Sequence, residues 1–101
     1  MLFDYRVDGY EITKKDQALI EEKILKLEKF DNRLQQADED TVKIHVNLVR
    51  GTRHNSPNFG LRVQLTAPSI SLRAEASGKT IPNAMDEVER KLRVQLEKLG
   101  S

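Results

Sequence analysis

The most regular pattern of hydrophobic and polar residues lies near the C-terminus, in residues 81–99 (IPNAMDEVERKLRVQLEKL). Apolar side chains recur there at intervals of three and four residues, which at about 100° per residue places them on one face of a helix. The apolar positions are Ile81, Ala84, Met85, Val88, Leu92, Leu96 and Leu99. Lys91 and Lys98 lie at the edge of this stripe, where a lysine packs its stem against the core and extends its ammonium group outward. This helix is therefore predicted to close the core and to carry a binding surface.

Four shorter segments alternate apolar and polar residues, which is typical of β-strands with one buried face. They cover residues 3–8, 42–48, 59–66 and 70–76. Only a short turn at Ala67 to Ser69 separates the last two of these segments. The last three strands are expected to form an antiparallel meander.

A second helix is predicted from about Lys14 to Asp31, with Thr13 as its N-cap, and Thr80 is the expected N-cap of the C-terminal helix. The residues expected to face the core from this second helix are Ile20, Ile24 and Leu27. Residues 32–40 are polar and predict a connecting loop. Residues 50–58 (RGTRHNSPN) contain glycine and proline and predict a mobile loop.

The predicted order of elements is β-α-β-β-β-α, an α+β fold. The connection through the first helix would make the first two strands parallel, with a right-handed crossover. Each helix has one apolar stripe, so we expect two helices packed on one face of a four-stranded mixed sheet. The other sheet face would be solvent-exposed, with Lys43, Arg62 and Arg73 on it. A chain of 101 residues suffices for one core, so residues 1–101 are expected to form a single domain.

The distribution of charge adds a functional indication. The net charge is only +1, but the stretch from Thr41 to Ala74 holds five basic residues and no acidic one, while the remaining twelve basic and sixteen acidic residues lie in the flanks. An asymmetry of this kind favours a polyanionic partner. A solvated sheet face that happens to use arginine explains it about equally well.

No motif for catalysis or cofactor binding is found in the sequence. The chain has no cysteine, and its histidines, His45 and His54, are not spaced as a metal-binding pair. Its glycines are isolated, which excludes a glycine-rich phosphate loop. We therefore expect no enzymatic activity, cofactor, metal or small-molecule substrate. No apolar run approaches the roughly 20 residues of a membrane span, and the lack of cysteine fits a reducing compartment, so we expect a cytoplasmic protein without membrane contact.

Nucleic-acid binding is the stronger chemical prediction, because lysine and arginine neutralise phosphates and release counterions. The candidate residues are Lys23, Lys26, Lys91 and Lys98 on the helices and Arg50 and Arg53 in the predicted loop. Only Tyr10 and Phe30 are expected to be available for stacking, which favours recognition of RNA backbone and shape over base stacking. The alternative is that the lysines of the first helix are routine solubilising charges.

Several segments, in this order along nearly the whole chain, resemble the ribosome hibernation-promoting factors. They are EIT (11–13), KILKLEK (23–29), LTAP (65–68), AEASGK (74–79) and KLRVQLEKL (91–99). This family includes protein Y and was once described as sigma-54 modulation proteins. The chain resembles the short form of the family, which lacks the C-terminal dimerisation domain.

The resemblance implies a fold similar to double-stranded RNA-binding domains and a function as a translation inhibitor in idle ribosomes. The partner would be the small ribosomal subunit, bound through its 16S rRNA in the decoding region where mRNA and tRNA sit. The family's basic positions correspond here to Lys23, Lys26, Lys29, Lys91 and Lys98. The sequence departs from the family at Val94, where a basic residue is usual, and Arg90 or Arg93 would compensate.

Two alternatives remain open from the sequence. The chain could be a general binder of structured RNA. It could instead be a protein-interaction module that regulates a transcription factor through its exposed sheet face or first strand, as the older sigma-54 description implies. The resemblance also leaves room for a separate partner protein that pairs ribosomes.

Overall fold

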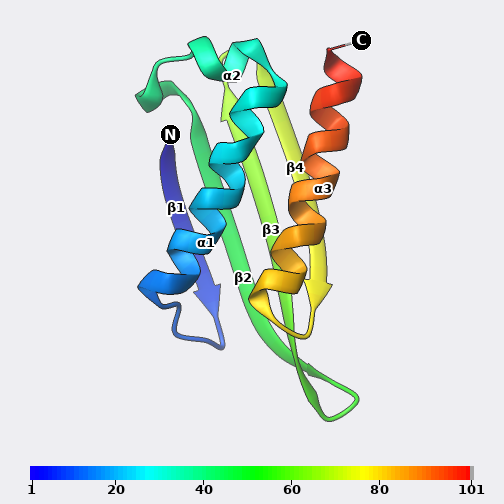
Figure 1. Cartoon of the computed structure of the whole chain (residues 1–101). Coiled ribbons are helices and arrows are strands. Elements are labelled where there is room, and N and C mark those ends of the chain that lie inside the picture. The colour runs from blue at the N-terminus through cyan, green and yellow to red at the C-terminus, as the bar shows by residue number, and fades with distance from the viewer. Residues whose placement is uncertain (101) are drawn as a thin grey trace.

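The computed structural model describes residues 1–100 and arranges four strands as one sheet (Figure 1). The strands are β1 (Leu2–Asp8), β2 (Lys43–Arg53), β3 (Ser56–Ala67) and β4 (Ile70–Gly78). Their order in the sheet is β1-β2-β3-β4, with β1 parallel to β2 and the other neighbours antiparallel. The predicted mixed sheet is therefore confirmed.

Both long helices lie on the same face of this sheet (Figure 1). The helical elements are α1 (Lys14–Leu25), the 3₁₀ helix η1 (Lys26–Phe30), α2 (Asn32–Gln36), the 3₁₀ helix η2 (Glu39–Thr41) and α3 (Ile81–Leu99). The helix α3 packs on β3 and β4. This arrangement confirms the predicted α+β fold with two helices on one sheet face.

Threonine side chains begin both long helices, as predicted. Thr13 Oγ1 accepts a hydrogen bond from the backbone N–H of Asp16 at 3.0 Å, and Asp16 Oδ2 accepts one from the N–H of Thr13 at 3.1 Å. This reciprocal pair is a capping box, which satisfies two otherwise unpaired donors. At α3, Thr80 Oγ1 accepts a hydrogen bond from the N–H of Asn83 at 3.2 Å.

The core lies between the helices and the covered sheet face. Ile20, Ile24 and Leu27 are fully buried there, together with the predicted stripe of α3 from Ile81 to Leu96. Leu99 is the exception, with 49% of its surface exposed, because it occupies the last turn of α3. The opposite sheet face is exposed, as predicted.

The predicted loop at residues 32–40 is wrong, because it contains the short helix α2 and the 3₁₀ turn η2. Asp31 caps α2 by accepting a hydrogen bond from the N–H of Arg33 at 2.7 Å. Leu34 anchors α2 in the core with 2% exposure. Leu34 is the only apolar residue of α2, and a single apolar residue gives no periodic pattern from which a helix could be predicted. The predicted second helix also differs, since its α-helical part ends at Leu25 and continues as η1.

The predicted loop at residues 50–58 is wrong as well, because β2 and β3 continue as a hairpin that extends beyond the rest of the sheet (Figure 1). A two-residue turn of His54 and Asn55 joins the strands, and both residues have positive φ, 53° and 62°. Such turns match the twist of paired strands. Pro57 pairs with Thr52, where its nitrogen faces away from β2, so the missing N–H removes no ladder hydrogen bond.

Candidate nucleic-acid interface

Lys23 bridges the two long helices. Its Nζ lies 3.2 Å from Asp86 Oδ1 of α3, and 26% of its side chain is exposed. The hydrogen bond to Asp86 raises the pKa of the Lys23 ammonium above its ordinary value, and the nearby Glu89 carboxylate acts in the same direction. Lys26, one turn further on, lies 3.8 Å from Glu22 Oε1 on its own helix. Both lysines are therefore paired with carboxylates.

Phe30 brings together cations from two elements. Lys29 Nζ lies 5.4 Å from the centroid of the Phe30 ring, and the guanidinium carbon of Arg93 lies 5.9 Å from the same centroid. Phe30 is 38% exposed. Cations at such distances are attracted to the face of an aromatic ring. This cluster of Lys29, Phe30 and Arg93, here called the Phe30 cluster, places two positive charges and a partly open aromatic ring on the helix-covered side.

Arg93 was named in the sequence only as one of two residues that could compensate for Val94, and its place beside Phe30 was not predicted. Its sequence position carries a usable signal, since it follows Asp86 by seven residues and therefore lies on the same side of α3. That side faces α1, as the contact between Asp86 and Lys23 demonstrates.

Lys91 and Lys98 lie on a different side of α3. Lys91 Nζ donates a hydrogen bond to the carbonyl oxygen of Glu75 at 2.7 Å, and Gln95 Nε2 donates one to the carbonyl oxygen of Arg73 at 2.9 Å. Both acceptors belong to the edge strand β4. Lys98 follows Lys91 by two helical turns and shares its side of α3. The helix lysines were predicted to form one RNA-binding surface. Instead, Lys23 and Lys26 lie on the α1 side of α3, and Lys91 and Lys98 lie on its β4 side.

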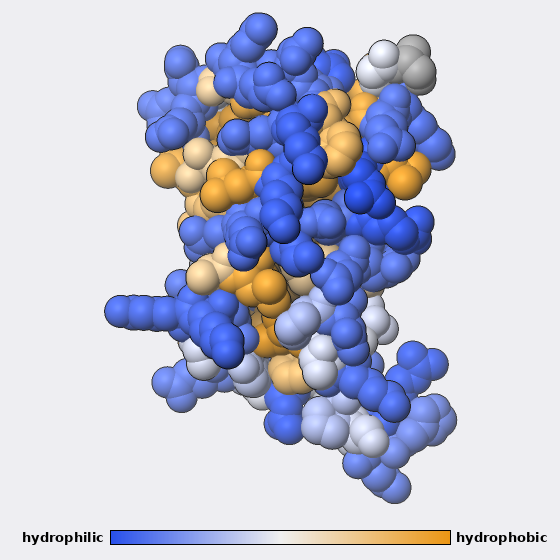
Figure 2. Space-filling model, viewed as in Figure 1, coloured by the Kyte–Doolittle hydropathy of each residue, from blue (hydrophilic) through white to orange (hydrophobic). Residues whose placement is uncertain are grey.

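The remaining predicted helix residue, Arg90, is paired with Glu87 on its own helix through Nη2 and Nε. Together, α3 contains four acidic and four basic residues. Figure 2 accordingly shows hydrophilic side chains over most of the helix-covered face, with apolar patches between them. The helix layer is a surface of mixed charge.

Arg50 and Arg53 lie apart from the helix lysines, on the β2–β3 hairpin. Arg50 pairs with Phe59, and Arg53 pairs with Ser56 next to the turn. Both arginines are exposed. The structure therefore separates the predicted basic residues into three groups, which are the α1 and Phe30 side, the β4 side of α3, and the hairpin.

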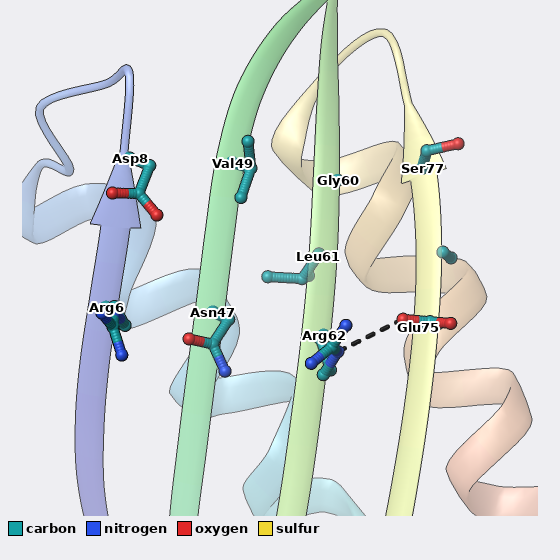
Figure 3. A pocket seen from close by; sticks show the side chains of 10 residues that line it. Arg6, Asp8, Asn47, Val49, Gly60, Leu61, Arg62, Glu75 and Ser77 are labelled. Carbon is teal, nitrogen blue, oxygen red and sulfur yellow. Dashed lines mark hydrogen bonds and ion pairs between the residues drawn. The ribbon is translucent and has the colours of Figure 1, made fainter.

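The exposed sheet face carries a shallow hollow of about 610 Å³ (Figure 3). Arg6, Asn47, Arg62 and Glu75 form one row across all four strands. Arg62 Nε lies 3.2 Å from Glu75 Oε2. Gly60 has no side chain to fill the adjoining row, which leaves the surface hollowed there. This face combines positive and negative groups.

Within residues 1–100, no group of three or more histidine, aspartate or glutamate side chains is arranged to hold a metal ion. His45 Nδ1 lies 3.3 Å from Asp4 Oδ2 on the exposed sheet face. No helix in the same part of the chain is both long and apolar enough to cross a membrane.

The geometry can be compared with solved structures. The N-terminal domain of protein Y from Thermus thermophilus has a TM-score of 0.75 and 17% identity, and the match covers 98% of this chain and 99% of that one. A ribosomal subunit interface protein from Coxiella burnetii has a TM-score of 0.74 and 19% identity, over 99% and 98% of the two chains. These likenesses establish the fold.

Sequence comparison establishes the family. A ribosome hibernation promotion factor from Lactococcus lactis subsp. cremoris is 33% identical over 96 residues, which is 95% of this chain and 48% of that protein. The chain thus spans about half the length of this curated relative. Residues 3–100 match the family model described as sigma 54 modulation protein / S30EA ribosomal protein. The chain therefore belongs to the sigma 54 modulation protein / S30EA ribosomal protein family.

Proposed function

We propose that this chain binds the small ribosomal subunit at the 16S rRNA of the decoding region and blocks translation in idle ribosomes. Family membership over residues 3–100 supports a role on the ribosome. The name of the related hibernation promotion factor supports the inhibitory role. The mechanism would be competitive occlusion, in which the bound chain occupies the space of mRNA and tRNA and no covalent bond changes.

The observation that carries this proposal is the Phe30 cluster, because it joins cations from η1 and α3 around an exposed aromatic ring. Positive side chains neutralise phosphates and release counterions, which supplies affinity for RNA backbone. The ring of Phe30 offers a surface on which a splayed base can stack. Folded rRNA presents both phosphates and unpaired bases.

The carboxylate partners of Lys23 and Lys26 do not prevent this role. The side chains of Asp86 and Glu22 are 62% and 66% exposed. Ion pairs this exposed contribute little, typically less than about 1 kcal/mol. An RNA phosphate can therefore replace the carboxylate at either lysine at small cost.

Co-sedimentation with purified small subunits, followed by translation in vitro, tests the proposal. Replacing Lys26, Lys29 and Arg93 by glutamine should weaken binding and relieve inhibition. A matched control replaces three other exposed lysines, Lys14→Gln, Lys15→Gln and Lys43→Gln, and should retain most of the binding. If the wild-type chain stays in the supernatant at low salt and translation is unaffected, the proposal is wrong.

Two alternative functions can be distinguished from the proposed one by binding experiments. A general binder of structured RNA would bind any RNA duplex as tightly as the small subunit. The hollow on the exposed sheet face favours a protein partner, such as a transcription factor or a protein that pairs ribosomes. Capture of that partner from lysate would survive nuclease treatment, whereas an RNA-mediated association would not.

A further inference from the structure

A second basic site lies at the end of the molecule formed by the β2–β3 hairpin. The hairpin and the connection from β4 to α3 line a cavity of about 440 Å³ that is open to solvent. Three basic side chains line it, Arg53 and His54 from the hairpin and Lys79 from the connection. Ser56, Asn58 and Ser77 add hydroxyl and amide groups. The residues come from separate segments and are brought together only by the fold.

The charge of this cavity differs from that of the helix layer. None of its lining residues is acidic. Among residues 1–100, neither Arg53 nor Lys79 has a carboxylate within ion-pair distance, whereas Lys23, Lys26 and Arg90 each have one. The positive charges at the hairpin end are therefore not offset by a local partner.

Both walls of the cavity are held in place by the backbone. On one side, the Arg53–Ser56 pair closes the two-residue turn, and His54 is kept in the left-handed region at φ 53°. Two-residue hairpin turns require this conformation, so the turn fixes the position of His54 at the edge of the cavity. On the other side, a Cβ at Gly78 would lie 3.0 Å from the backbone nitrogen of Ala84, so the connection that carries Lys79 packs closely on α3.

We propose that this cavity binds a phosphate group of the RNA backbone, as a contact separate from the helix layer. Arg53 can donate two hydrogen bonds to one phosphate, and Lys79 supplies a second charge. The serine hydroxyls and the Asn58 amide can donate the remaining hydrogen bonds. The choice of RNA as the source of the phosphate rests on the proposed function, while the phosphate site rests on the cavity.

The position of the cavity gives it a distinct effect on affinity. The hairpin and α2, which follows Phe30, lie at opposite ends of the molecule (Figure 1), whose longest dimension is 44 Å. A single rigid chain would then hold RNA at two distant points. Two linked contacts bind more tightly than either alone, because the second binding event is intramolecular.

Titration with inorganic phosphate, followed by amide NMR shifts, tests the site without RNA. The wild-type chain should show shifts concentrated in residues 53–56, 58 and 77–79, and the double variant Arg53→Gln Lys79→Gln should lose them. The control Lys43→Gln Arg73→Gln removes the same charge from the exposed sheet face and should retain them. An absence of shifts in the wild type, or equal shifts in the Arg53/Lys79 variant, overturns the site.

Salt-dependent binding to small subunits tests whether RNA is the source of the phosphate. Loss of one phosphate contact should reduce the log–log salt slope by roughly 0.9 in the Arg53/Lys79 variant, if the contacted RNA is duplex-like, and leave it unchanged in the Lys43/Arg73 control. If the salt slope fell equally in the Arg53/Lys79 variant and in the Lys43/Arg73 control, the effect would be one of net charge, and the proposed RNA contact would be wrong. If the wild-type chain binds inorganic phosphate but neither it nor any variant binds small subunits, the proposed function is wrong and the phosphate site is retained. If subunits bind and the Arg53/Lys79 variant changes neither measurement, the site fails and the proposed function stands.

Discussion

Lys91 Nζ donates a hydrogen bond to the carbonyl oxygen of Glu75 at 2.7 Å and so ties the middle of α3 to the edge strand β4. Gln95 makes the equivalent bond to Arg73, one turn further along. An uncovered edge strand is a site for unwanted pairing with other chains, and these two side chains occupy two of its acceptors. Lys91 therefore has a structural partner as well as a proposed role in RNA binding.

The double variant Lys91→Ala Gln95→Ala should be less stable than wild type by about 1–2 kcal/mol, because two hydrogen bonds to β4 are lost. Urea unfolding measures this change, and Lys14→Ala, at the exposed start of α1, is the control. If the double variant kept its stability but lost binding to small subunits, Lys91 would contribute to RNA binding and not to the stability of the fold.

The ion pair of Lys23 and Asp86 predicts a gain of binding. Asp86→Asn removes the carboxylate that holds Lys23, so this variant should bind small subunits more tightly, and the pKa of Lys23 should fall toward its ordinary value. Glu97→Gln removes the same charge from the exposed end of α3. Subunit affinity and NMR titration of the lysine measure the two effects. Equal affinity gains in both variants would contradict a specific role for the pair.

Gly9 predicts a sharp difference between two glycine substitutions. Its φ is 74°, and a Cβ there would lie 2.8 Å from the carbonyl oxygen of Arg50, whereas a Cβ at Gly51 meets nothing within 4 Å. Gly9→Ala should therefore lower the free energy of unfolding by more than about 1 kcal/mol, while Gly51→Ala should have little effect. Chemical unfolding of both variants provides the measurement. Similar losses in the two would contradict the close approach of Gly9 to the hairpin.

Asp31 predicts a loss of stability in acid. Hydrogen bonds from Arg33 hold the pKa of this buried carboxyl below its ordinary value. A lowered pKa in the folded state contributes stability that is complete above the ordinary aspartate range, near about 4, and is lost as the pH falls through the lowered value. Asp31→Asn keeps a capping oxygen and should show a shallower decline of stability below about pH 4. Parallel declines in both proteins would contradict the assignment.

Much of the fold could be predicted from the sequence because its signals are local and repeated. Alternation identified all four strands, and Thr13 and Thr80 marked where helices begin. The hairpin turn was missed because His54 and Asn55 are not the Asn-Gly or Asp-Gly pair that marks such turns, and because Pro57 suggests a break in a strand. That proline is tolerated only because its nitrogen faces away from the partner strand.

The arrangement of the candidate site was less predictable. Helical phase places Lys91 at the edge of the apolar stripe but does not reveal that β4, and not α1, lies beside that edge. The meeting of Lys29 and Arg93 at Phe30 depends on η1 packing against α3, a contact between distant segments. The cavity at Arg53 and Lys79 likewise depends on a hairpin whose turn was not predicted.

Hydroxyl-radical footprinting of 16S rRNA in small subunits, with and without the chain, tests directly where the chain binds. If it binds as proposed, protected nucleotides should cluster in the decoding region, where mRNA and tRNA sit, and protection should be lost in the Lys26, Lys29 and Arg93 glutamine variant. Protection confined to other regions of the subunit, or no protection at concentrations that inhibit translation, would contradict it.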